Sequence, residues 1–198
     1  DGQITAKSTD NLAMLIKGSI RSGEGRLAVT GVWDPAGQLD QPLDLRLIGK
    51  NVALADTPNM QLNADVDVLL GSLAGIYSMQ GDVHLRNGLV NLETIGANVS
   101  ISNDVTVVDP APEKAARDLL KLSINLKVRI DETVRVKGFG LDGTVEGAVL
   151  VNSPFDSPTR LTGSLNLLGN YGTYGQKLRV KRGNIQYFNA EVDEPILN

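Results

Sequence analysis

The chain has 198 residues, of which 41% are hydrophobic and only 4% aromatic, so its apolar surface comes almost entirely from aliphatic side chains. It contains no cysteine and a single histidine, His84, which excludes disulfides, thiolate chemistry, cysteine-ligated zinc and sites with several histidines. The net charge is −4 with both signs interspersed, so no surface for nucleic acid is indicated. No stretch approaches the ~20 apolar residues of a transmembrane helix.

In the first half of the chain, apolar and polar residues alternate over several short segments. Successive side chains of a β-strand point to opposite faces, so this alternation predicts strands with one apolar and one polar face. In chain order the apolar sets are Leu12, Met14 and Ile16; Leu43, Leu45 and Leu47; Met60, Leu62, Ala64, Val66 and Val68; Val83 and Leu85; and Val99 and Ile101.

The second half continues the pattern and holds its clearest example, residues 122–130. There Leu122, Ile124, Leu126, Val128 and Ile130 alternate with polar and charged residues. A helix would scatter the same side chains around its circumference, so the segment is predicted to be a strand. The later sets are Val134 and Val136; Val149 and Val151; Leu161, Leu165 and Leu167; Leu178 and Val180; and Ile185 and Tyr187.

Clusters of Gly, Pro, Asn and Asp between these segments predict short turns, which join antiparallel neighbours. We therefore predict an all-β fold, an antiparallel meander of roughly a dozen or more strands with at most one short helix, in one β-rich domain over residues 1–198. Residues 109–120 are Ala-rich, charged and contain two prolines, and we predict a mobile loop or short helix there. The predicted turns are 22–25, 34–37, 87–88, 138–143, 153–154 and 182–184.

Residues 138–143 match the G-x-G-x-x-G pattern of nucleotide-binding loops. Phosphate binding by that pattern requires a helix directly after it, because the helix N-terminus holds the phosphates. Residues 144–151 instead alternate like a strand. The motif is therefore predicted to be a hairpin turn.

Asp65 and Asp67 share the polar face of one predicted strand, about 6–7 Å apart. Carboxylate pairs at that range can hydrolyse glycosides, but the acid needs surroundings that raise its pKa, which an exposed strand face does not supply. His84 lies on the polar side of its strand, and the sequence has no second histidine and no cysteine that could form a catalytic or metal site with it. No nucleophile, base and oxyanion set is found, so we predict a protein without catalytic residues, metal or cofactor.

The continuous apolar face must be hidden from water. One solution is a sandwich or barrel with a filled interior. The other is a sheet bent into an elongated trough whose lining is left unfilled for a ligand. The scarcity of aromatic residues favours the trough without deciding between them, because aliphatic side chains can also fill a sandwich.

Residues 161–188 run LTGSLNLLGNYGTYGQKLRVKRGNIQYF, and residues 193–198 run DEPILN. This segment resembles the C-terminal signature of the TamB family: a strand of small residues, G-x-Y-x-x-Y-G-Q, an alternating strand, R-G, and an acidic residue before Pro and Leu-Asn. The resemblance is most specific over residues 144–198, and upstream only the strand-and-glycine texture agrees. Phe188-Asn189-Ala190 departs from it, since a glycine-bearing turn is expected there.

The resemblance implies a sheet bent lengthwise into an apolar trough of the β-taco type. It further implies a fragment of a much larger periplasmic protein of a Gram-negative bacterium, anchored in the inner membrane by a segment absent from this chain. The implied partners are a TamA-type outer-membrane barrel protein, phospholipids and nascent outer-membrane proteins. The expected trough lining is Leu122, Ile124, Leu126, Val128, Ile130, Met60, Leu62, Val66, Val68, Leu43, Leu45, Leu47, Leu165 and Leu167.

Three functions follow from these observations. The first is a conduit in which phospholipid acyl chains move between the two membranes, together with a role in outer-membrane protein assembly. The second is a chaperone whose trough or sheet edge receives strands of nascent outer-membrane proteins. The third is a filled β-sandwich or adhesin module with a structural role only.

Overall fold

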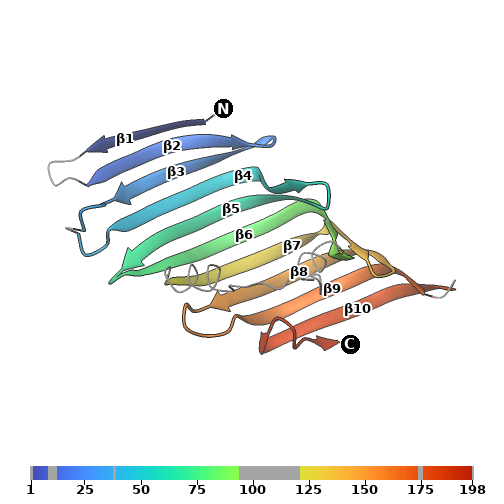
Figure 1. The fold of residues 1–198 in the computed structure, drawn as a ribbon. Helices are drawn as coiled ribbons and strands as arrows, with labels where there is room; N and C mark the ends of the chain where they lie inside the picture. Colours follow the sequence, from blue (N-terminus) through green and yellow to red (C-terminus); the bar gives the residue numbers. More distant parts are fainter. Residues whose placement is uncertain (1, 9–12, 38, 94–120, 174–175, 198) are drawn as a thin grey trace, which may run out of the picture.

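The protein is a single-layer β-sheet (Figure 1). A computed structural model describes residues 2–8, 13–37, 39–93, 121–173 and 176–197. In these ranges eleven strands form one open sheet in sequence order, which is not closed into a barrel. The prediction of an all-β fold is confirmed, whereas the described residues form no second layer of the kind that a filled sandwich requires.

The first three strands and the last are short, and β4 to β10 are long. The bounds are β1 (Gly2–Ser8), β2 (Met14–Ser22), β3 (Gly25–Trp33), β4 (Leu43–Thr57), β5 (Met60–Leu73), β6 (Ile76–Asn91), β7 (Leu122–Gly138), β8 (Leu141–Ser153), β9 (Arg160–Thr173), β10 (Gln176–Glu191) and β11 (Ile196–Leu197).

The pair β6–β7 corrects the predicted antiparallel meander, because these two strands run parallel, from Tyr77 opposite Leu122 to Asn91 opposite Lys137. All other neighbours are antiparallel. Parallel neighbours need a crossover of a dozen or more residues, for which the segment between β6 and β7 is long enough. The strand predicted at Val99 and Ile101 and the loop or helix predicted over 109–120 lie outside the described residues.

Two predicted turns are also wrong. Asn87-Gly88 lies inside β6, and 182–184 lies inside β10. Each coincides with a register shift against a neighbouring strand, so these residues form β-bulges and the strands continue through them. The other predicted turns are confirmed, since 22–25, 34–37, 138–143 and 153–154 each lie at or beside the end of a strand.

Register assigns the side chains to two faces, because directly paired residues point to the same side of a sheet. We call apolar face the face that carries Leu126 of β7 and every residue paired with it across the sheet. One row across this face is Ile4, Gly18, Val29, Leu47, Val68, Gly81, Leu126, Val151 and Leu161. We call the opposite side, with Lys127, the polar face.

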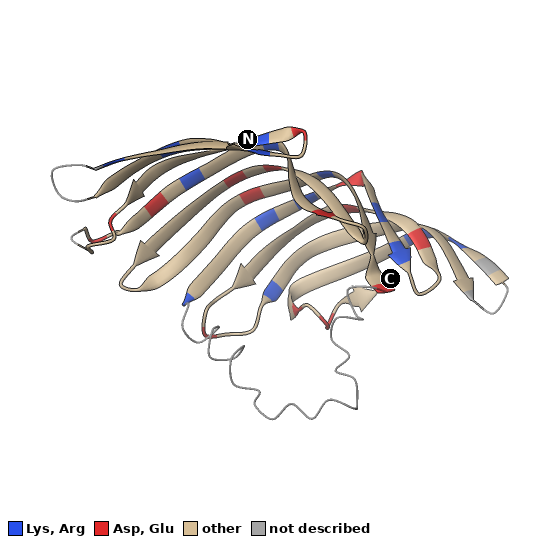
Figure 2. Ribbon diagram, turned by 45° about the horizontal axis from the view of Figure 1, so that its top comes forward, with Lys and Arg blue, Asp and Glu red and all other residues tan. Residues whose placement is uncertain are grey.

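The sheet is curved as well as twisted, and its charged residues are spread over many strands (Figure 2). Register shifts occur at neighbouring levels of the central strands, at Gly49/Val52 of β4, Leu85/Gly88 of β6 and Ile130/Val134 of β7. Bulges bend strands and increase their local twist. The aligned bulges therefore make a crease across the middle of the sheet.

Candidate functional site: the two faces of the sheet

The apolar face is the more buried of the two faces. Its most buried apolar side chains are Val52, Ala64, Val68, Val134 and Val149, each less than a tenth exposed. Along β7 the burial alternates with the sequence, so that Leu126 and Val128 are half-buried while Lys127 and Arg129 are exposed. Side chains of neighbouring strands therefore pack against one another on this face, although the described residues provide no second layer over it.

The register brings the predicted lining residues together. All of them lie on the apolar face, and all are half-buried or buried. The positions paired on this face hold no charged residue in the part of the chain that the structure describes. The lining members on β4, β5, β7 and β9 are Leu43, Leu45 and Leu47; Met60, Leu62, Val66 and Val68; Leu122, Ile124, Leu126, Val128 and Ile130; and Leu165 and Leu167.

Glycines on the apolar face lie where neighbouring backbones approach closely. Gly81 has φ +145°, and a Cβ there would lie 2.2 Å from the carbonyl oxygen of Asp67. Gly147 has φ +137°, and its Cβ would lie 2.3 Å from the carbonyl oxygen of Ser164. Residues with a side chain do not fit either position. These glycines let the strands bend without placing a bulky group on the face.

Cross-strand ion pairs cover the polar face. Nη2 of Arg46 lies 2.9 Å from Oδ2 of Asp67 on the next strand. Nε of Arg135 lies 2.8 Å from Oδ1 of Asp142. Hydrogen bonds from these guanidinium groups hold the pKa of each aspartate below its usual value.

Asp65 is bound in a similar way. Its carboxylate accepts a hydrogen bond from the backbone N–H of Asn51 and two from Arg86, which lower its pKa. A general acid needs a raised pKa, whereas the pKa values of Asp65 and Asp67 are lowered. Their arrangement favours the interpretation as structural surface residues.

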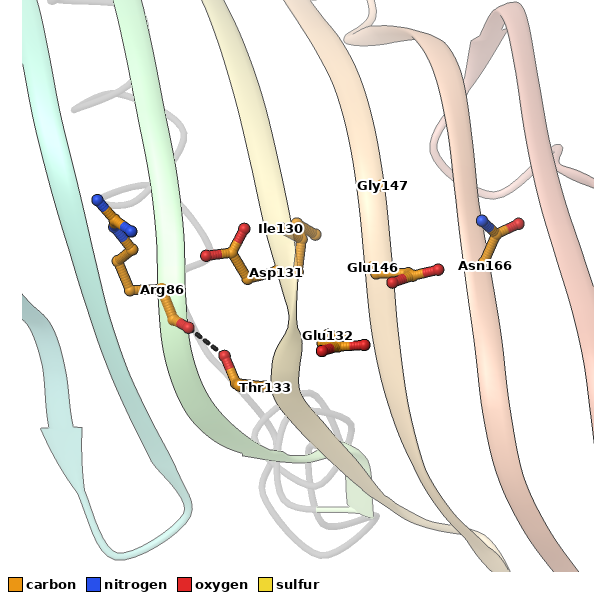
Figure 3. A pocket seen from close by; sticks show the side chains of 8 residues that line it. All are labelled: Arg86, Ile130, Asp131, Glu132, Thr133, Glu146, Gly147 and Asn166. Carbon is orange, nitrogen blue, oxygen red and sulfur yellow. Dashed lines mark hydrogen bonds between the residues drawn. The ribbon is translucent and has the colours of Figure 1, made fainter.

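A shallow cavity of about 630 Å³ lies at the crease on the polar face (Figure 3). Arg86, Asp131, Glu132, Glu146 and Asn166 contribute to its lining. The Thr133 hydroxyl donates a hydrogen bond to the carbonyl oxygen of Arg86, across the bulges of β6 and β7. Nearby, His84 Nε2 lies 2.6 Å from Asp131 Oδ1.

Within this cavity the polar groups are used mainly to join strands. Among the described residues, no three His, Cys, Asp or Glu side chains come together in a way that could hold a metal ion. The cavity supplies no hydroxyl or amine activated by a base. The contact between His84 and Asp131 therefore joins β6 to β7 at the crease.

The G-x-G-x-x-G segment is the hairpin turn between β7 and β8, as predicted. Phe139 and Gly140 occupy the turn with φ values of +50° and +84°. β8 begins directly at Leu141, so no helix N-terminus is present to receive a phosphate.

Sequence reasoning missed three strands and the aromatic residues at one end of the apolar face. β1, β3 and β11 were not predicted, although Leu27 and Val29 of β3 alternate correctly with polar neighbours. At one end of the apolar face stand Trp33 of β3 and Tyr77 of β6. Only the register places them in one row, because they are far apart in the sequence.

Two further findings bear on the assignment. No helix in the described part of the chain combines the length and hydrophobicity needed to cross a bilayer. The model of the TamB C-terminal domain family matches residues 16–198, which extends well upstream of residue 144.

Proposed function

This chain belongs to the TamB C-terminal domain family, and from that premise we propose that its apolar face is a trough for the acyl chains of phospholipids. TamB proteins are non-enzymatic envelope proteins of Gram-negative bacteria that work with TamA in the translocation and assembly module. The chain is accordingly a module involved in outer-membrane assembly. The finer proposal is that lipids pass along it between the inner and outer membranes.

The continuity of the apolar face carries this proposal. Eleven strands spaced ~4.8 Å apart span roughly 50 Å, a sizeable part of the distance between two membranes. Each lipid methylene removed from water on such a surface gains about 0.8 kcal/mol. Since the paired positions of this face are uncharged in the described ranges, an acyl chain meets mainly aliphatic contacts along the way and no charged side chain that would hold it in place.

The setting of the module is part of the proposal. We place the chain in the periplasm, held at the inner membrane by a segment outside residues 1–198, with a TamA-type barrel protein as its outer-membrane partner. The polar face would then be in contact with water, which agrees with its exposed ion pairs.

Photocrosslinking in cells tests the trough directly. A benzophenone residue replaces Leu126 on the apolar face or, as a matched control, Leu150 on the polar face, where it is 41% exposed. We expect phospholipid adducts from position 126 and few from position 150. Equal yields from the two positions, or no lipid at position 126, would contradict the proposal.

Transport is tested with the same two positions. Leu126→Arg places a charge on the apolar face, and Leu150→Arg places one on the polar face. We expect the first to block phospholipid transfer between membranes and the second to leave it near the normal rate, with circular dichroism confirming that both variants fold. A folded Leu126→Arg protein that supports normal transfer would rule out the conduit.

The edges of the sheet favour a second candidate, a chaperone for nascent outer-membrane strands. β11 covers β10 only at Ile185 and Gln186, and the outer side of β1 pairs with no other strand in the described ranges. Unpaired edges can accept an additional strand through backbone hydrogen bonds. A crosslinker at Gln3 of β1 would then yield peptides of outer-membrane proteins, and the absence of such peptides would exclude this role for the β1 edge.

A further inference from the structure

At one end of the apolar face, four neighbouring strands form a pocket. Trp33 of β3, Leu43 of β4, Ser72 of β5 and Tyr77 of β6 lie in one row, each paired with the next. Together with the loop that follows β3 they surround a cavity of about 440 Å³. The loop contributes Asp34, Pro35, Gly37 and Pro42 to the lining.

Ser72 gives this pocket an unused hydrogen-bonding group. The residue is only 5% exposed, and its hydroxyl has no hydrogen-bond partner among the described residues. A buried hydroxyl without a partner costs free energy, because its hydrogen bonds to water are lost and not replaced. Its place in the pocket lining indicates a ligand that supplies the missing partner.

The two aromatic residues on either side indicate what kind of ligand this is. Trp33 is 44% and Tyr77 39% exposed, although both belong to the otherwise more buried face. Trp and Tyr are typical of boundaries between apolar and aqueous surroundings, where the ring contacts lipid and the polar atom contacts water. Their faces also attract ammonium groups.

Asp34 determines the sign of the charge that the pocket favours. It is 2% exposed, and its carboxylate accepts hydrogen bonds from the backbone N–H groups of Ala36, at 3.0 Å, and Leu39, at 2.7 Å. No Lys, Arg or His lines the pocket. A carboxylate without a cation repels anionic headgroups and attracts an ammonium group.

We propose that this pocket binds the polar end of a zwitterionic aminophospholipid such as phosphatidylethanolamine. The ammonium group lies against Trp33 and Tyr77 near Asp34 and donates a hydrogen bond to the Ser72 hydroxyl oxygen, a charge-assisted contact that a headgroup without an ammonium group lacks. The acyl chains continue over Leu43 and Leu45 onto the apolar face. This inference rests on the proposed function and adds selectivity for the headgroup at one end of the trough.

Selective binding tests the pocket. The chain is incubated with vesicles of equal parts phosphatidylethanolamine and phosphatidylglycerol and re-isolated, and its bound lipids are quantified by mass spectrometry. We expect the unmodified chain to enrich phosphatidylethanolamine about fivefold, the effect of roughly one hydrogen bond. In Ser72→Ala and Trp33→Leu the ratio should return toward that of the vesicles, while total bound lipid changes less than twofold.

The variants separate binding from folding. Ser72→Ala removes a hydroxyl that has no partner in the described structure, so its thermal unfolding temperature should be equal to or above that of the unmodified chain. Ser164→Ala, at an exposed position of the polar face, is the matched control and should keep the full enrichment.

Each result is decisive. If the unmodified chain does not enrich phosphatidylethanolamine, or if Ser72→Ala still enriches it, the pocket does not select the headgroup and the inference is overturned. Lipid bound in equal amounts by all variants would still support the trough. If no variant binds lipid at all, the proposed function itself fails.

Discussion

The carboxylate of Asp65 joins the irregular segments of two neighbouring strands. Its Oδ1 atom lies 3.0 Å from the backbone nitrogen of Asn51 in β4, and its Oδ2 atom lies 2.7 Å from Nη2 of Arg86 in β6. Asn51 has φ +50° within the β4 bulge, and Arg86 lies within the β6 bulge. Asp65 thus fastens three strands on the polar face at the crease.

Acid should weaken this link. Because the pKa of Asp65 is lowered in the folded protein, its contribution to stability is present above the unfolded pKa of about 4 and is lost as the pH falls through the folded value. We expect Asp65→Asn to lower the free energy of unfolding at pH 7 by about 1 kcal/mol. Between pH 7 and pH 3 the free energy of unfolding should fall less in this variant than in the unmodified chain. Urea unfolding at pH 7 and pH 3 measures both effects. Asp82→Asn, on the same face, is the control and should lose as much stability on acidification as the unmodified chain. An equal loss of stability in Asp65→Asn would contradict the stabilising role of the Asp65 carboxylate.

Gly81 should be intolerant of any side chain. In Gly81→Ala the new Cβ would meet the carbonyl oxygen of Asp67 at a φ that L-residues rarely adopt, so we expect a loss of about 2–4 kcal/mol. Gly71→Ala is the control, since its Cβ would lie 3.2 Å from the Ser78 hydroxyl oxygen without a positive φ. Urea unfolding should show a small change for Gly71→Ala, and similar losses in both variants would show that close approach at Gly81 is not the cause.

Asn189 explains the departure of Phe188-Asn189-Ala190 from the expected glycine-bearing turn. Asn189 has φ +53° at the register shift of β10, and Asn is among the residues that tolerate this conformation. We expect Asn189→Gly to be neutral or stabilising by up to about 1 kcal/mol and Asn189→Val to be destabilising by about 1–2 kcal/mol. Thermal unfolding of the two variants decides, and the opposite order would be incompatible with this geometry.

Val68 tests how dry the apolar face is. Val68→Thr keeps the shape but buries a hydroxyl at a site that is 5% exposed, so we expect a loss of about 1–3 kcal/mol in urea unfolding. The reverse change, Thr162→Val on the polar face, lies at an exposed position and should stay within about 0.5 kcal/mol of the unmodified chain. Tolerance of threonine at position 68 would mean that water reaches the face.

Alternation along the chain was sufficient to predict the two faces. Side chains of a strand alternate between its two sides. The apolar residues of 122–130 therefore had to lie on one side of their strand, and those of 60–68 on one side of theirs, wherever the strands were placed. The hairpin at 138–143 was also predictable, because glycine-rich turns between alternating segments are local features.

Tertiary structure alone decided how the strands meet. The parallel pairing of β6 and β7 depends on a long connection, and local residues do not encode the direction in which the chain returns. Asn-Gly pairs occur both in turns and in bulges, so the sequence alone could not show that Asn87-Gly88 forms a bulge. The row of Trp33, Ser72 and Tyr77, and the unpaired hydroxyl within it, arises from pairing between separate strands. Short-range patterns therefore determined which side of each strand is apolar, while long-range pairing determined which side chains became neighbours.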